Sequence, residues 1–186
     1  MCDPFGTVEI RVVVWYYYIN VRAISIEAIN LTGISHFDTK YAVDCCEKDR
    51  NKLMEIYDIL DMLDWNKPLP VQQKGIMLAA NIKDIHYFMQ PLTLRHGKNV
   101  WDNCALIVTQ RTDDELRPFL CNLFEWLQDM NWPGADRIYD RLIRISHPDL
   151  IHALQYSLAL AKQTNDCPWE QSLRCFLDEY MAKLTD

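Results

Sequence analysis

The stretch LFEWLQDMNWPGA, residues 123–135, predicts the end of one helix, a tight turn and the start of a second helix. Asn131 can hydrogen-bond backbone groups within the turn, and Pro133 is well suited to the first turn of the next helix. Trp126 and Trp132 are large apolar residues that fill space at the helix end and in the turn. Apolar residues recur at helical spacing on both sides of the stretch. The stretch therefore predicts a helical hairpin.

The same alternation of amphipathic segments and proline-bearing turns extends over residues 48–184. The second helix of each predicted pair begins near Pro70, Asn99, Pro133 or Pro168. A spacing of roughly 30–35 residues with two helices per unit is typical of an α-solenoid. We therefore expect an all-α fold, a HEAT-like α-solenoid of about four irregular helical hairpins, with a plain helical bundle as the alternative. Between Asp84 and Lys98 only a short helix or a loop is expected, because Pro91 interrupts the segment.

Residues 1–47 differ from the rest in composition, since β-branched and aromatic residues dominate them, including the run VVVWYYYI at 12–19. No clear hairpin turn divides this segment, and two strands alone are marginally stable. We therefore expect an N-terminal segment, 1–47, that is β-like in composition or disordered, followed by a helical domain, 48–186. The run is too short for a membrane helix and lacks the flanks of a signal peptide. A cytoplasmic protein without a membrane partner is predicted.

The length, glycine content and charge of the chain argue against some classes of fold and of binding partner. The chain has 186 residues, five glycines and a formal net charge of −7. A chain of this length can bury a core without a metal or disulfides, and few glycines argue against an all-β fold. The negative charge argues against nucleic acid as a partner and favours a basic protein.

The cysteines and histidines do not form a recognisable metal site. The seven cysteines include no C-x-x-C pair, and the five histidines are scattered. We expect reduced thiols, with Cys104, Cys121 and Cys175 inside apolar helical patterns as small hydrophobic residues. No glycine-rich phosphate-binding motif is present either, so neither a metal nor a cofactor is predicted.

Two acidic pairs are the strongest polar features of the central hairpin. Within helices, Glu125 and Asp129, and likewise Asp136 and Asp140, would share a face at i, i+4 spacing. Acidic pairs on surface helices are usually solvated, so no catalytic residues are predicted. The candidate partner-binding residues are Glu125, Asp129, Trp126, Trp132, Asp136 and Asp140.

The run at 123–135 has the pattern L-x-x-W-L-x-D-x-N-W-P-x-A and resembles a bacterial family known only as a domain of unknown function. The resemblance is best from Asp113 to Ile145 and does not reach residues 1–46. The stretch LDWNKP at 63–68 looks like a diverged copy of the run. The resemblance implies a small HEAT-like helical domain of bacterial type. It carries no established activity, although some relatives of this general kind are immunity or interaction proteins.

The sequence supports two functional hypotheses. The first is a non-enzymatic protein–protein interaction module with a basic partner, in its sharpest form a bacterial immunity protein that binds a basic toxin. The alternative is a HEAT-like DNA-binding or DNA-repair glycosylase-type enzyme, because Arg137, Arg141 and Arg144 would form a basic stripe on one helix. Asp136 and Asp140 would partly neutralise that stripe, with an expected intrahelical pair between Asp140 and Arg144.

Overall fold

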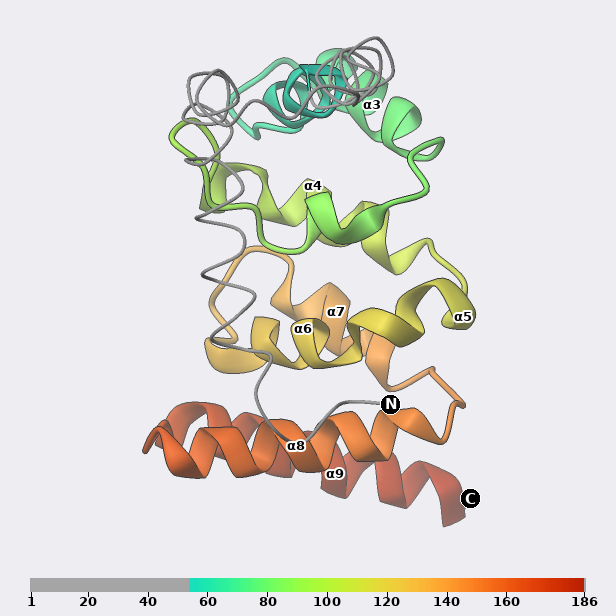
Figure 1. Ribbon diagram of the computed structural model, residues 1–186, viewed down its shortest axis with the longest axis vertical. Coiled ribbons are helices and arrows are strands. Elements are labelled where there is room, and N and C mark those ends of the chain that lie inside the picture. Colours follow the sequence, from blue (N-terminus) through green and yellow to red (C-terminus); the bar gives the residue numbers. More distant parts are fainter. Residues whose placement is uncertain (1–53, 186) are drawn as a thin grey trace, which may run out of the picture. The chain divides into compact units, whose positions relative to one another are not determined.

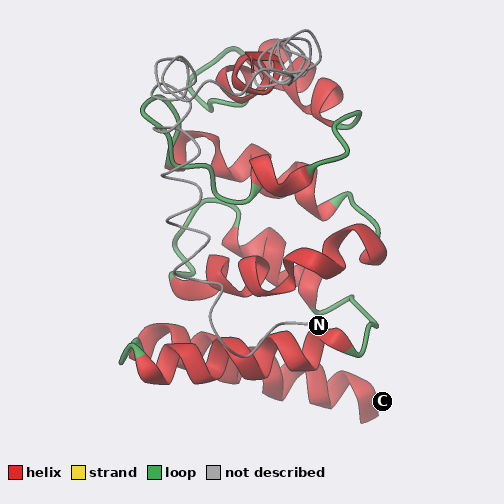
Figure 2. Cartoon of the chain, viewed as in Figure 1, coloured by secondary structure: helices red, strands yellow, loops and turns green. Residues whose placement is uncertain are grey.

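The computed structural model describes residues 54–185, which belong to the unit Asp49–Asp186, and every regular element among them is helical (Figures 1 and 2). The predicted all-α class is confirmed. After a helix at 54–62, the elements are α3 (Leu69–Ala79), η2 (Ile85–Phe88), α4 (Lys98–Thr109), α5 (Asp113–Leu116), η3 (Arg117–Phe119), α6 (Leu120–Glu125), η4 (Trp126–Gln128), α7 (Ala135–Leu142), α8 (Asp149–Gln163) and α9 (Cys167–Thr185). The expectation for residues 1–47 lies outside the described residues.

The helices of this unit are arranged in layers in the order of the chain from α3 to α9 (Figure 1). α3 packs on α4, and α4 packs on η2 and α7. α6 packs on α8, which in turn packs on α9, while η4 contacts both α7 and α9. As expected, the segment between Asp84 and Lys98 contains only the short helix η2. The finer assignment to HEAT-like repeats stays a prediction.

The amphipathic segment 113–127 does not form one continuous helix. It starts at α5, where Thr112 and Glu115 form a reciprocal capping box. After Leu116 the chain tightens into η3, which contains Pro118. Proline lacks an amide donor and disfavours helical backbone at the preceding residue. The segment therefore breaks into α5, η3, α6 and η4.

Three tryptophans occupy the core, each with its indole N–H satisfied by a backbone carbonyl. Trp101 donates to Pro91 O at 3.0 Å, Trp126 to Pro133 O at 3.1 Å and Trp169 to Phe124 O at 2.9 Å. All three are buried. These bonds allow large side chains to fill the interior without leaving a buried donor unpaired.

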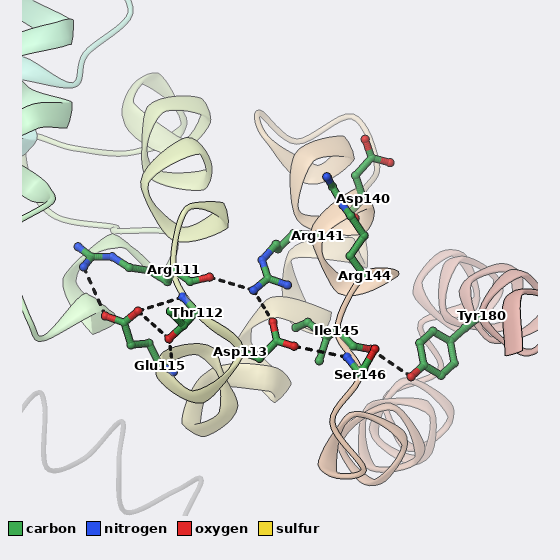
Figure 3. Close-up of polar contacts among 10 residues, drawn as sticks. All are labelled: Arg111, Thr112, Asp113, Glu115, Asp140, Arg141, Arg144, Ile145, Ser146 and Tyr180. Carbon is green, nitrogen blue, oxygen red and sulfur yellow. Dashed lines mark hydrogen bonds and ion pairs between the residues drawn. The ribbon is translucent and has the colours of Figure 1, made fainter.

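Polar side chains join successive layers by binding backbone carbonyls at, or a few residues beyond, the C-terminal ends of helices. Arg111 donates to Ala79 O at 2.8 Å, beyond which α3 ends. Arg141 donates to Arg111 O at 2.9 Å, and Tyr180 donates to Ile145 O at 3.1 Å (Figure 3). Cations at helix C-termini also interact favourably with the helix dipole.

The cysteine predictions are only partly correct. Cys104 is buried on α4, and burial raises the pKa of its thiol. Cys175 is exposed on α9, because the apolar stripe of that helix runs through Trp169, Leu173 and Phe176 instead. Among the described residues, no helix is both long and apolar enough to cross a membrane.

Candidate partner-binding groove

An open groove of about 390 Å³ lies between the turn after η4, α7 and α9. Its lining residues are Met130, Tyr139, Pro168, Gln171, Ser172 and Cys175. The four from α9 recur at i, i+3, i+4 and i+7, so they share one face of that helix. We call this surface the α7–α9 groove.

Tyr139 projects from α7 and is held in place by two groups of α9. Its hydroxyl donates to Glu179 Oε2 at 2.8 Å, and its ring meets the edge of Phe176 with centroids 5.4 Å apart. Burial, together with the hydrogen bond to the Glu179 carboxylate, raises the pKa of Tyr139. The phenol is therefore neutral at physiological pH, and Glu179 supplies the negative charge beside it.

Two further carboxylates lie on α7, one turn apart. Asp136 and Asp140 are both outside the core, as the sequence predicted for a solvated acidic pair. The expected ion pair between Asp140 and Arg144 does not form. α7 ends at Leu142, and Arg144 Nε donates to the backbone oxygen of Asp140 at 2.8 Å (Figure 3). The carboxylate of Asp140 is therefore not paired with Arg144 and lies near Tyr139.

The other predicted acids are separated from each other by the end of a helix. α6 ends at Glu125, and Asp129 has extended backbone after η4, so the two do not share a helix face. Glu125 is half-buried beside Asn122, and burial raises the pKa of its carboxyl. Asp129 Oδ1 accepts two hydrogen bonds from Asn131, at 2.9 and 3.0 Å. Its role is to shape the turn.

The two predicted tryptophans lie away from the α7–α9 groove. Trp126 is fully buried in the core, which removes it from the candidate binding surface. Trp132 is half-buried against α4, where its ring meets the edge of Trp101 at 5.4 Å and lies 5.3 Å from Lys98 Nζ. Both rings pack against Trp101 of α4.

The three arginines of the predicted basic stripe each bind groups of the same chain. Arg137 forms an ion pair with Asp102 at 3.0 Å. Arg141 is mostly buried and bonds Asp113 as well as a backbone carbonyl (Figure 3). Arg144 lies beyond the end of α7 and bonds Asp140 O. The three do not form a continuous basic face.

Sequence reasoning missed Met130, Tyr139, Cys175 and Glu179 as members of one site. Tyr139 and Glu179 are separated by 40 residues, and only the packing of α7 near α9 brings them together. A tyrosine between two acids was the one local signal that marked this face of α7. Among the described residues, no cluster of three metal-ligating side chains occurs.

Comparison with known families finds a similarity in the second part of the chain. Residues 98–185 match the family described as Domain of unknown function (DUF5071). The match agrees with the resemblance to a domain of unknown function, and it extends past Ile145 to the end of α9. No curated protein and no solved structure matches the chain. Every residue that lines the α7–α9 groove lies within the DUF5071 region.

Proposed function

We propose that this chain is a non-enzymatic protein–protein interaction module, and that the α7–α9 groove binds a basic segment of a partner protein. The observation that carries the proposal is the carboxylate of Glu179, fixed by Tyr139 at the groove. Asp136 and Asp140 add two negative charges on the same helix as Tyr139. No lysine, arginine or histidine is among the six residues that line the groove.

This combination of side chains suits the recognition of lysine or arginine. A cation gains from nearby carboxylates and from the face of an aromatic ring. Met130 adds an adaptable apolar surface that can cover the methylene stem of such a residue. The net charge of −7 would also speed the approach of a basic partner.

The groove has little that would support catalysis. Cys175 is an exposed thiol in the groove, but none of the other lining residues is a histidine or lysine that could activate it. Glu125, the acid whose pKa is raised by burial, is not among the groove residues. These features support a binding surface over an active site.

The DNA-binding alternative lacks a comparable observation. It requires arginines that can face phosphates, whereas Arg137 and Arg141 are engaged with carboxylates of the same chain. In the sharper form of our proposal, the protein is a cytoplasmic bacterial immunity protein, and the groove covers a basic surface of a toxin.

The test is affinity capture by the full-length chain from an extract of the cells that produce it. A double variant, Asp136→Asn with Asp140→Asn, removes two charges beside the groove. Its matched control, Asp114→Asn with Glu115→Gln, removes two exposed charges on α5 that line neither groove, and glutamine keeps the capping box. We expect the wild-type chain and the control to retain the same basic protein, and the groove variant to lose most of it. Retention of an acidic partner or of nucleic acid, or equal retention by both variants, would overturn the proposal.

A further inference from the structure

A second groove, of about 400 Å³, lies between the helix at 54–62 and α3, far along the chain from the first. It is lined by Met54, Glu55, Asp58, Ile59, Met62 and Leu78. We call it the methionine groove. It lies outside the DUF5071 region and shares no residue with the α7–α9 groove.

Apolar side chains are unusually exposed around this groove. Met54 has 66% of its surface exposed, Met77 has 70%, and Leu78, which lines the groove, has 37%. An exposed apolar patch next to a groove marks a contact surface.

The charge at the methionine groove restricts what can bind there. Glu55 and Asp58 are both exposed, and within residues 54–185 neither forms an ion pair. The groove residues include no cation. A second copy of the chain is disfavoured, because a two-fold contact would bring two sets of these carboxylates together. A ligand that is apolar on one side and basic at its edges matches both properties.

We propose that the methionine groove binds an amphipathic helix of another protein, with an apolar face over Met54 and Met62 and with lysine or arginine beside Glu55 and Asp58. An apolar helix face laid in a hydrophobic groove is a recurrent mode of peptide recognition. Methionine is unbranched and flexible, so it fits apolar faces of irregular shape. This binding is independent of the α7–α9 groove.

The test uses the full-length chain and a fluorescein-labelled 18-residue peptide, with leucines at i, i+3, i+4 and i+7 and lysines at the other positions. Fluorescence anisotropy should show saturable binding. The variant Glu55→Lys with Asp58→Lys should weaken binding by on the order of tenfold. The variant Asp114→Lys with Asp178→Lys, which changes the net charge equally at exposed acids that line neither groove, should leave the affinity within about twofold. Circular dichroism checks that both variants remain folded.

A second peptide, with serine in place of every leucine, separates helix docking from charge attraction alone. We expect it to bind at least about tenfold more weakly than the leucine peptide. Equal binding of the two peptides would overturn the proposal, as would equal loss in both charge-reversal variants. No binding of the leucine peptide would also overturn it, and would indicate that the chain itself or a second copy covers the groove. The capture experiment of the proposed function does not depend on any of these outcomes.

Discussion

The turns at 64–66 and 129–131 share their hydrogen bonds but lead into helices with different surfaces. In the first, Asn66 donates its backbone N–H and its side-chain amide to Asp64 Oδ1, at 2.8 and 2.9 Å. In the second, Asn131 donates the same two groups to Asp129, at 2.9 and 3.0 Å. The resemblance between the two stretches of sequence therefore has a physical basis in a repeated turn.

The helix beyond each turn decides the chemistry of the surface. Ten residues after Asp64 the chain has Lys74, whereas ten residues after Asp129 it has Tyr139. Only the second turn therefore leads to an aromatic side chain that lines a groove and hydrogen-bonds a carboxylate, that of Glu179. The turn supplies the backbone geometry, and binding depends on the side chains of the next helix.

Both turns contact α4, but through different kinds of interaction. Asn99, at the start of α4, donates to Asp64 Oδ2 at 2.8 Å and accepts from Trp65 N at 3.0 Å. The second turn instead places the backbone of Gly134 against Trp101 and Ala105. The first contact is polar and the second depends on the absence of a side chain. Substitutions can test this difference.

The largest effect is expected for Gly134→Ala. Gly134 has a φ of 81°, and a Cβ there would overlap the Cβ of Ala105. Left-handed backbone costs a residue with a side chain about 1–2 kcal/mol, and overpacking adds about 1–3 kcal/mol. We expect a loss of about 3 kcal/mol in the free energy of unfolding, measured by urea denaturation.

Gly75→Ala is the matched control within α3. Its Cβ would lie 2.8 Å from the Cβ of Met62, but its φ is not positive. Alanine favours a helix by about 1 kcal/mol over glycine, which offsets part of the overpacking. A loss equal to or larger than that of Gly134→Ala would contradict the different roles assigned to the two glycines.

An intermediate effect is expected for Asp64→Ala compared with Asp129→Ala. Asp64 accepts from Asn66 and also from Asn99, whereas Asp129 accepts side-chain and backbone bonds from Asn131. We expect losses of about 2 and about 1 kcal/mol in the free energy of unfolding, because hydrogen bonds to charged groups are stronger than neutral ones. Thermal and urea unfolding of both variants would measure this, and the reverse order would refute the polar link to α4.

The smallest effect is expected in the pH dependence of stability. Burial alone would raise the pKa of Asp64. Hydrogen bonds from Asn66 and Asn99 lower it by more than burial raises it, so the pKa of Asp64 is below its ordinary value. A carboxyl with a depressed folded-state pKa contributes stability above its unfolded pKa, and this is lost as the pH falls through the folded value. Asp64→Asn should therefore lose less stability than the wild type as the pH falls from neutrality through that range. Parallel urea titrations check this, and identical pH profiles would exclude the contribution of Asp64.

The sequence predicts the positions of the turns better than the continuity of the helices. Proline-bearing turns place the starts of α3 and α7 well, but only Pro70 lies in the first turn of its helix; the prediction for Pro133 is wrong, because Pro133 precedes Gly134, the N-cap of α7. The same residue type misleads at Pro118, where an amphipathic pattern continues through a break in the helix. Periodicity reports which residues face the core, and both α-helical and 3₁₀ segments can satisfy it.

The candidate site is less predictable than the fold. Asp136 and Asp140 can be found from their spacing on one short helix. The bond between Tyr139 and Glu179 depends on the packing of helices that are distant in the chain, and no local pattern encodes that. The solvent exposure of a tryptophan side chain cannot be predicted from the sequence either. Trp126 and Trp132 have similar sequence surroundings, yet Trp126 is fully buried and Trp132 is half-buried.

The most direct test places a photo-crosslinker at the same position of each turn. Met130 and Trp65 come directly after Asp129 and Asp64, and they are 41% and 49% exposed. Each is replaced in turn by p-benzoylphenylalanine, and the full-length chain is irradiated in an extract of the cells that produce it. We predict a crosslink to a basic protein from position 130 and none from position 65, with the crosslink lost in the variant Asp136→Asn with Asp140→Asn. Equal crosslinking from both positions, or none from position 130, would contradict the assignment of partner binding to the α7–α9 groove.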